Sequence, residues 1–188
     1  MPHVIGERLI LREYREDDFD SIRRWVNDPE TTRYLSNIFL KPQTALQTEK
    51  FLQGILSGTN TGYCFVVADK QTQEYYGQID ILQVEPVSRC GEIGLVIAPW
   101  AWHNGYAREA LGLVERYAFE QVNLNRLYLD VFAENVRARA AYRAAGFVEE
   151  GVQREHVFKE GRYHDLVRMG ILRREWAENA KSESTPGA

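Results

Sequence analysis

Apolar and polar positions alternate with period two along some stretches of the chain and recur every three to four residues along others. The first pattern predicts β-strands and the second predicts amphipathic helices. Polar turns separate the strands, and the turn at 159–161 marks a hairpin. Strands are expected at 8–14, 63–68, 75–84, 89–97, 127–132, 147–158 and 163–172, helices at 17–26, 44–56, 108–118 and 136–145, and a loop at 57–62.

The order of these elements predicts the α+β class, with one mixed, mostly antiparallel sheet flanked by helices on both faces. A chain of 188 residues is long enough to build one domain with its own core. We expect a single domain over residues 1–172. A C-terminal tail over 173–188 is expected to be partly disordered, above all in the polar stretch from Lys181 onwards.

The turn between the expected strand at 91–98 and the helix at 108–118 has a chemical implication. Backbone N–H groups at a helix N-terminus lack intrahelical partners and carry the positive end of the helix dipole, so they favour a phosphate group. Gly105 within the turn has a simpler explanation as well, since glycine suits any tight strand-to-helix corner. The turn lacks the glycine spacing of the common dinucleotide and nucleoside triphosphate motifs.

A second informative stretch is Ala133–Phe147, which follows the strand expected at 127–132. Asn135 is a favourable N-cap, and Gly146 is a favourable residue just after the helix end. Tyr142 then lies one turn before the end of the helix.

Together the two stretches, Asn-Gly-Tyr-Ala-Arg-Glu-Ala and Glu-Asn-x-x-Ala-x-x-x-Tyr-x-x-x-Gly-Phe, resemble the GNAT superfamily of acetyl-CoA-dependent N-acetyltransferases. The resemblance covers about Gly6 to Leu172. The N-terminal part resembles the branch of ribosomal-protein N-terminal acetyltransferases and spermidine acetyltransferases, through Glu7-Arg-Leu-Ile-Leu-Arg12, Asp17-Asp-Phe19, Trp25, Asn27-Asp-Pro-Glu30 and Arg33-Tyr-Leu35.

This resemblance implies a GNAT-like sheet whose fourth and fifth strands, here 92–97 and 127–132, run parallel and splay apart. The pantetheine arm of acetyl-CoA would lie in that gap. Cofactor-binding residues implied in this way are Leu95, Val96, Ile97, Trp102, His103, Asn104, Gly105, Tyr106, Ala107, Arg108, Asn135, Ala138 and Tyr142.

The chemistry requires a neutral amine and a proton for the departing thiolate. The resemblance implies that Tyr142 is the general acid, although a tyrosine of such a helix can also simply pack beneath the sheet. The resemblance implies that Glu92 is the candidate base, because relatives commonly carry an acidic residue at this place early on the fourth strand. Strand alternation places it with Gly94 and Val96 on one face. Glu92 could equally be a surface residue paired with an arginine, and Asp80 on the adjacent strand is the reserve.

Two departures from the family pattern are visible. The residues before the key glycine of the turn are Trp102, His103 and Asn104, where relatives commonly carry a basic side chain. The segment 36–42 lacks the acidic cluster of spermidine acetyltransferases, which disfavours a polycationic acceptor. Trp25, Tyr34 and Phe39 are the apolar side chains near that segment that an acceptor could contact.

Charge and composition narrow the function further. The net charge of −4 disfavours a general nucleic-acid binder, and no apolar run approaches the roughly 20 residues that span a membrane. The two cysteines are expected to be reduced, which fits a cytoplasmic protein. Basic residues gather at 137–143, either as a solvated helix face or as contacts to cofactor phosphates, for which Arg108 and Arg137 are the candidates.

The four histidines do not have the spacing of metal ligands, so no metal is expected. His156 and His164 are expected to face each other across the C-terminal hairpin as a solvent-exposed pair. A role for either in holding an acceptor is the alternative.

Three functions remain open from the sequence. The first is an N-acetyltransferase that acts on a primary amine, either a small molecule or a peptide N-terminus. The second is a non-catalytic acetyl-CoA-binding sensor or interaction module, and the third is a modifier of ribosomal or other nucleic-acid-bound protein. A homodimer through the C-terminal strands is compatible with each.

Overall fold

The computed structural model describes residues 4–59 and 61–183. It contains an eight-stranded sheet in the order β1-β2-β3-β4-β5-β6-β8-β7, in which only the β5–β6 pair is parallel. The strands are β1 (Val4–Ile5), β2 (Leu9–Arg12), β3 (Tyr63–Asp69), β4 (Tyr75–Glu85), β5 (Cys90–Ile97), β6 (Arg126–Phe132), β7 (Val148–Lys159) and β8 (Arg162–Leu172). The main helices are α1 (Asp18–Trp25), α2 (Pro29–Thr32), α3 (Ala45–Leu56), α4 (Tyr106–Arg116), α5 (Val136–Ala144) and α6 (Arg173–Glu183).

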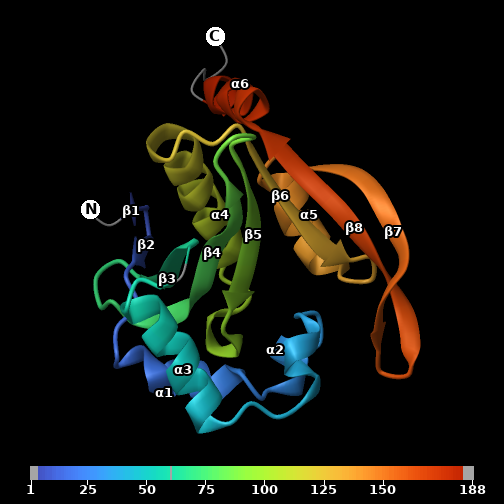
Figure 1. Ribbon diagram of the computed structural model, residues 1–188. Coiled ribbons are helices and arrows are strands. Elements are labelled where there is room, and N and C mark those ends of the chain that lie inside the picture. The colour runs from blue at the N-terminus through green and yellow to red at the C-terminus, as the bar shows by residue number, and fades with distance from the viewer. Residues whose placement is uncertain (1–3, 60, 184–188) are drawn as a thin grey trace.

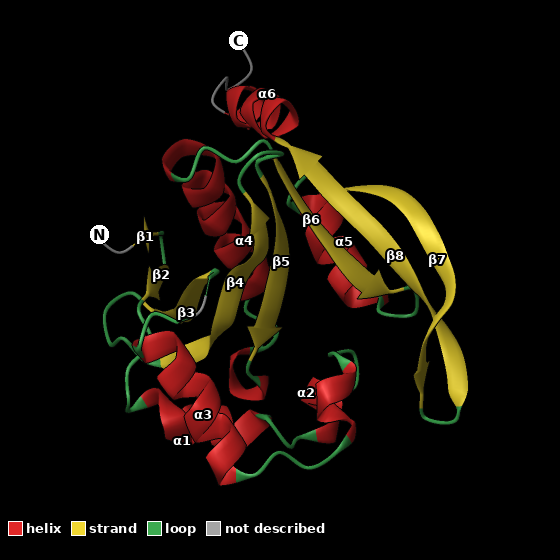
Figure 2. Cartoon of the chain, in the orientation of Figure 1, coloured by secondary structure: helices red, strands yellow, loops and turns green. Residues whose placement is uncertain are grey.

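The sheet separates two apolar cores. Alternating strand residues such as Leu9, Leu11 and Ile93 pack with α4 on one face, while Ile10 and Val66 pack with α1 and α3 on the other. Figures 1 and 2 show α4 and α5 behind the sheet and α1–α3 in front of it. The predicted α+β class, with helices on both faces of a mostly antiparallel sheet, is therefore confirmed.

The predicted splay is also visible. Strands β5 and β6 pair at only three positions, Cys90 with Arg126, Gly91 with Leu127 and Glu92 with Tyr128. Beyond these pairs the two strands diverge, as Figure 1 shows, although β5 continues to Ile97. The divergence leaves one backbone edge of β5 without a neighbouring strand.

Helix α6 corrects the expected C-terminal tail. Residues from Arg173 onwards form a helix, and the ring of Trp176 packs against Phe119 with 5.4 Å between centroids. Because the segment contains few apolar positions, its sequence has no amphipathic pattern that would predict a helix. The expected disorder from Lys181 fails for residues 181–183, which are helical, whereas 184–188 lie outside the described residues.

Short elements between the predicted ones were not anticipated. Helix α2 and the 3-10 turn Asn37–Leu40 (η1) connect α1 to α3, and a 3-10 turn at Pro99–Ala101 (η2) follows β5. Helix α4 ends in a π-turn at Tyr117–Gln121. The loop expected at 57–62 lies between α3 and β3, and Asn60 within it is outside the described residues.

Candidate active site

The free edge of β5 presents backbone groups to the gap. Ala98 N–H donates to Tyr76 O on β4, and hydrogen bonds alternate along an antiparallel strand. The N–H and C=O groups of Ile93, Leu95 and Ile97 therefore point away from β4 and toward β6. Those of Val96 point to β4, so only two of the three residues expected to pair with the cofactor arm face the gap.

The turn after β5 has the geometry of an anion site. Gly105 adopts a left-handed backbone with φ of 75°, which a residue with a Cβ disfavours, and it serves as the N-cap of α4. No side chain caps this helix, and the first N–H group with a backbone partner in the turn is that of Glu109, bonded to Gly105 O. Among the described residues, the N–H groups of 106–108 are thus open to a ligand.

Trp102 and Asn104, which replace the usual residues of the turn, hold it in place. The indole Nε1 of Trp102 donates to Ile97 O at 2.7 Å, and the Asn104 side-chain amide donates to Trp102 O at 2.9 Å. The turn is tied in this way to the end of β5. His103 is exposed, with a positive φ of 64°.

Arg8 brings a guanidinium group to the turn, where it is paired with Glu109. Its Nη1 donates to Asn104 O at 2.8 Å, and its Nε pairs with Glu109 Oε2 at 2.9 Å. Its Nη2 lies 3.7 Å from the point where a Cβ on Gly105 would stand. The guanidinium also lies 5.0 Å from the ring centroid of Tyr106, so several contacts fix its orientation.

Sequence reasoning did not identify Arg8 as a site residue. It is separated from Asn104 by 96 positions, and only the pairing of β2 within the sheet brings it to the turn. The sequence feature that could have pointed to this contact is Glu109, an acidic residue in the first turn of α4. Its carboxylate accepts hydrogen bonds from the backbone N–H groups of Arg8 and Leu9.

Helix α5 presents the candidate acid. The Asn135 side chain accepts from Ala138 N–H at 3.1 Å, which confirms the predicted N-cap, and Gly146 has the predicted left-handed backbone. Tyr142 is half-buried against the α4-side core, and its ring contacts Phe147 at 5.9 Å. Burial raises the pKa of the Tyr142 hydroxyl to about 12, which keeps it protonated at neutral pH.

Glu92 lies on the opposite face of the sheet, near the point where β5 and β6 separate. Its carboxylate accepts from Gln83 Nε2 at 2.7 Å. Burial raises its pKa, helped by the nearby Asp130 carboxylate, while Arg168 acts in the other direction. Arg168 is itself paired with Asp130 at 2.6 Å, so Glu92 has no direct arginine partner among the described residues.

Asp80, the reserve base, is less accessible. It is only 8% exposed and lies opposite Gly94 in the β4–β5 register, on the same face as Glu92. Burial raises its pKa to about 7, and hydrogen bonds from Cys64, the Phe65 backbone and Tyr14 oppose that rise. The face therefore holds two carboxyl groups that bind protons more strongly than usual.

The basic residues of α5 divide into two groups. Arg139 and Arg143 both pair with Glu149, at 2.8 and 2.5 Å, and so form part of a helix-to-strand ion pair. Arg137 instead lies 5.1 Å from the ring of Trp102, at the turn. Of the two residues expected to contact the adenine-ribose phosphate, Arg137 therefore lies beside the turn.

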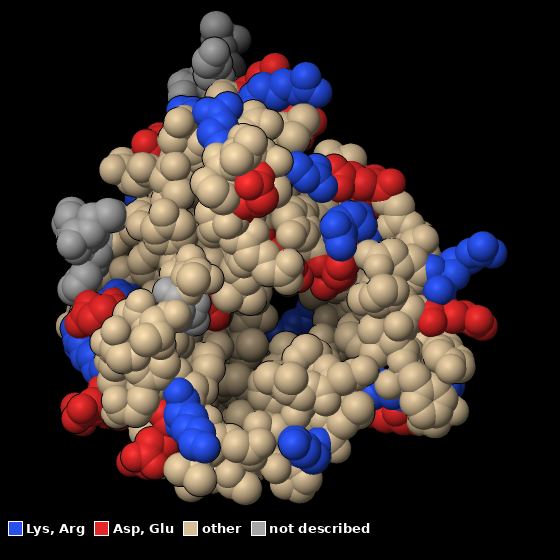
Figure 3. Space-filling model, viewed as in Figure 1, with Lys and Arg blue, Asp and Glu red and all other residues tan. Residues whose placement is uncertain are grey.

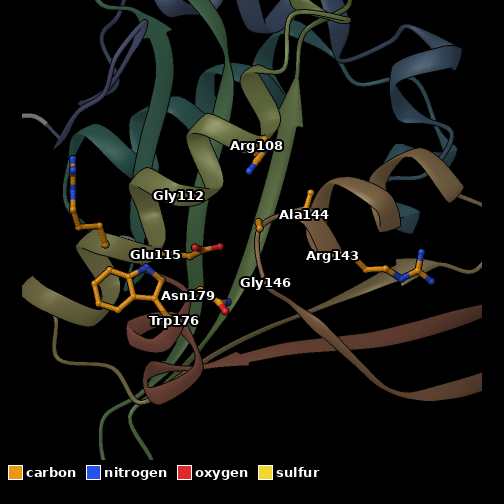
Figure 4. Close-up of a pocket in the computed structure, with 10 residues that line it drawn as sticks. Arg108, Gly112, Glu115, Arg143, Ala144, Gly146, Trp176 and Asn179 are labelled. Atoms are coloured by element: carbon orange, nitrogen blue, oxygen red, sulfur yellow. The ribbon is translucent and has the colours of Figure 1, made fainter. Parts of the chain in front are cut away.

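Arg108, the other candidate, lines a different cavity. Figure 4 shows this space of about 440 Å³ between α4, the end of α5 and α6, with Glu115, Trp176 and Asn179 in its wall. Glu115 is 3% exposed, its Oε1 atom has no hydrogen-bond partner, and burial raises its pKa to about 8. Residues of α4, of the end of α5 and of α6 line this cavity, and none of its lining residues belongs to β5.

The apolar side chains expected near the acceptor lie on the other face. Trp25 and Phe39 contact each other at 6.0 Å in the core beneath α1 and α3, whereas Tyr34 contacts Phe132 at the end of β6 at 5.6 Å. In Figure 3 the surface on this face is hollowed at its centre, with acidic and basic side chains at the edge. Of the three, Tyr34 lies against the last residue of β6.

The expectation for the hairpin histidines is wrong. His164 is buried, with 6% exposure, and lies opposite Val157 rather than His156. Its Nε2 contacts Lys159 O at 3.0 Å and its Nδ1 lies 3.3 Å from Glu134. A β-bulge between Gln153 and Val157 shifts the register and separates the two histidines.

Within the described ranges, no group of three or more His, Cys, Asp or Glu side chains could hold a metal ion. Over the same residues, no helix is long and apolar enough to cross a membrane. Cys64 and Cys90 are both free thiols.

Comparison with known proteins also indicates an acetyltransferase. A family model described as the acetyltransferase (GNAT) domain matches residues 8–148. Spermidine N(1)-acetyltransferase from Vibrio cholerae is 35% identical over 177 residues, which cover 94% of this chain and 100% of that protein. The putative ribosomal N-acetyltransferase YdaF from Bacillus subtilis is 36% identical over 100 residues, which cover 53% of this chain and 55% of that protein.

Solved structures give the same answer for the fold. The crystal structure of spermidine N-acetyltransferase from Vibrio cholerae in complex with CoA and spermine has a TM-score of 0.81 and 29% identity, and the match covers 90% of this chain and 98% of that one. A GNAT-family acetyltransferase from Bacillus anthracis also has a TM-score of 0.81, at 21% identity.

Proposed function

This chain belongs to the GNAT acetyltransferase family and transfers an acetyl group to an amine, and we propose that it does so in the gap between β5 and β6. The amine is a primary amine of a small molecule or of a peptide N-terminus. It attacks directly while both substrates are bound. Acetyl-CoA, when bound, supplies the acetyl group as an activated thioester.

The main support for this proposal comes from two sets of open backbone groups, those on the free edge of β5 and those at the N-terminus of α4. The outward N–H and C=O groups of Leu95 and the Ile97 N–H suit an extended amide-bearing chain such as pantetheine, because a strand edge pairs with such a chain. The open N–H groups of 106–108 suit a pyrophosphate. Arg137 adds positive charge at the turn, and Arg8, which is paired with Glu109, adds a guanidinium group there. Asn135 and Ala138 lie at the start of α5, beside the turn.

The remaining residues carry the protons. Glu92 accepts a proton from the incoming ammonium group on the front face of the sheet, and its raised pKa suits a base that works near neutrality. Tyr142 lies on the opposite side of the sheet, where its hydroxyl donates a proton to the departing thiolate. The acid and the base thus approach the gap from opposite faces.

Polyamines are the first acceptors to try, because a relative matched along its whole length is a spermidine N(1)-acetyltransferase. The side chains of the front face also permit a second class of acceptor. Asp130 and Glu134 are paired with Arg168 and Arg162, so few carboxylates are left for a polycation. We therefore include peptides with a free N-terminus as the second class. The two free cysteines fit our proposal that the reaction takes place in the cytoplasm.

The test is release of free thiol from acetyl-CoA in the presence of spermidine, spermine, amino acids, aminoglycosides and short peptides. Tyr142→Phe is measured beside the wild type, and Tyr163→Phe, an exposed hairpin tyrosine, is the matched control. We expect acceptor-dependent release that falls about 100-fold in Tyr142→Phe only. A protein that binds acetyl-CoA but releases thiol with none of these acceptors would instead be a sensor or act on a protein acceptor outside the panel.

A further inference from the structure

Residues 28–42 form a segment that leaves the front face of the molecule and returns to the same point. We call it the acceptor segment; it contains α2 and η1. Its base is closed by Asn27 and Gln43: Asn27 Nδ2 donates to Gln43 O at 3.0 Å, and Gln43 N–H donates to Asn27 Oδ1 at 2.7 Å. The base is therefore fixed by contacts between residues close in sequence.

The far end of the acceptor segment is fixed by a residue from the other end of the chain. Lys159, at the tip of the projecting β7–β8 hairpin, donates from Nζ to Thr32 O at 2.9 Å and to Leu35 O at 3.1 Å. These residues are 127 and 124 positions apart from Lys159. β7 is otherwise largely exposed, but Lys159 is only 7% exposed.

Such a contact is costly in itself. Removing an ammonium group from water is unfavourable, and hydrogen bonds offset part of this cost. No carboxylate of the described residues forms an ion pair with Lys159. Its partners are two backbone carbonyls and the ring of Phe132, 5.9 Å from Nζ, and burial lowers its pKa. Its benefit is to join the hairpin to the acceptor segment.

The same cluster reaches the edge of the gap. Phe132 is the last residue of β6, and its ring contacts Tyr34 of the acceptor segment at 5.6 Å and His164 at 5.6 Å. Figure 1 shows α2 opposite the diverging ends of β5 and β6, with the hairpin beside it. The position of Lys159 therefore determines where Tyr34 and α2 stand relative to the gap.

We propose that Lys159 is a positioning residue for the acceptor: it holds the acceptor segment against Phe132 and so forms the amine-binding side of the gap. This inference rests on the proposed function, because it assigns the front side of the gap to the amine. It requires no contact between Lys159 and either substrate.

The first arm of the test does not depend on activity. Amide hydrogen exchange is measured across 29–40 in the wild type, Lys159→Met, Lys159→Arg and Arg162→Met, the last an exposed control at the same hairpin tip. Lys159→Met should speed exchange in 29–40 by at least about tenfold, since it removes two charge-assisted hydrogen bonds. Lys159→Arg should restore much of the protection, and Arg162→Met should leave it unchanged.

The second arm separates positioning from folding. With spermidine as the amine probe and, if spermidine is not acetylated, with the best peptide of the panel, Lys159→Met should raise KM for the amine about tenfold. KM for acetyl-CoA should stay within twofold. If Lys159→Met does not fold, Lys159→Gln, which keeps one amide donor, takes its place in both arms.

Unchanged exchange in 29–40, or an equal rise in KM for both substrates, would overturn the inference. Failure of the proposed function would look different. The wild type would then release no thiol with any amine, while the exchange arm would still report whether Lys159 holds the segment.

Discussion

The two sides of the gap are built in different ways. The half that we propose binds the cofactor, the cofactor half, consists of the β5 edge, the turn at 102–105, α4 and α5. Its fixing contacts are mostly local: Trp102 bonds Ile97 five positions away and Asn135 bonds Ala138 three positions away. The half that we propose binds the amine, the acceptor half, consists of the front face, the acceptor segment and the hairpin tip. Its fixing contact joins Lys159 to Thr32, 127 positions away.

This difference explains which half of the gap can vary between related proteins. A local motif carries its own geometry, because each residue is placed by its neighbours along the helix or turn. A surface assembled from distant segments changes when any one of them changes. The cofactor half can therefore stay the same in proteins whose acceptor halves recognise different amines.

The largest effect is expected at the base, which lies on the acceptor half. Glu92→Gln should lower kcat by about 100-fold, because the amide cannot accept the amine proton. The rate of the wild type should rise with pH as Glu92 loses its proton, through a pKa above that of an ordinary glutamate, and the variant should lack this limb. Initial rates across pH, with acetyl-CoA affinity as the control, measure both; an unchanged profile would exclude Glu92 as the base.

Asp80→Asn sharpens the distinction between the two carboxyl groups. The folded protein binds a proton at Asp80 up to a pH of about 7, whereas the unfolded chain loses it near pH 4. Stability should therefore fall as pH rises between these values. Urea unfolding at pH 5 and pH 8 should show a loss about 2 kcal/mol larger in the wild type than in Asp80→Asn. Equal losses would mean that Asp80 is ionised as usual.

Arg8→Gln tests a contact of the cofactor half between residues far apart in the sequence. Removing a charged donor at the turn should weaken CoA binding about tenfold, roughly 1.4 kcal/mol, but leave pantetheine binding unchanged, since pantetheine has no phosphates. Titration calorimetry with both ligands measures this. Arg15→Gln, an exposed arginine paired with Glu13, is the control. Equal loss for both ligands would assign Arg8 a purely structural role.

Gly105→Ala should have the smallest effect. Its φ of 75° costs an alanine about 1 kcal/mol, while the added Cβ has room, 3.7 Å from Arg8 Nη2. Gly58, with φ of 68° and open space around it, provides a matched control. Both variants should lose similar stability in thermal unfolding, but only Gly105→Ala should bind CoA more weakly. Equal CoA affinities of the two variants would show that the turn does not bind the phosphates of CoA.

The sequence alone predicted the cofactor half in some detail. The turn around Gly105 and the cap at Asn135 each depend on neighbouring residues, which sequence patterns describe well. Val96 shows the limit within this half: strand alternation was known, but the register against β4 was needed to see that its backbone points away from the gap.

The sequence could not predict contacts that depend on the assembled sheet. Arg8 reaches Asn104 only through strand pairing, and Lys159 reaches Thr32 only because the folded chain places the hairpin tip against the acceptor segment. The bulge that separates His156 from His164 is likewise a tertiary feature. Trp176 stabilises a helix whose own polarity suggested a tail.

The most direct test of this division is amide hydrogen exchange of the wild type with and without acetyl-CoA. We expect slower exchange at the outward N–H groups of Leu95 and Ile97 and at 106–108, with no change in the acceptor segment at 29–40. Protection confined to the cavity between α4 and α6, or strong protection of 29–40 by acetyl-CoA alone, would contradict it.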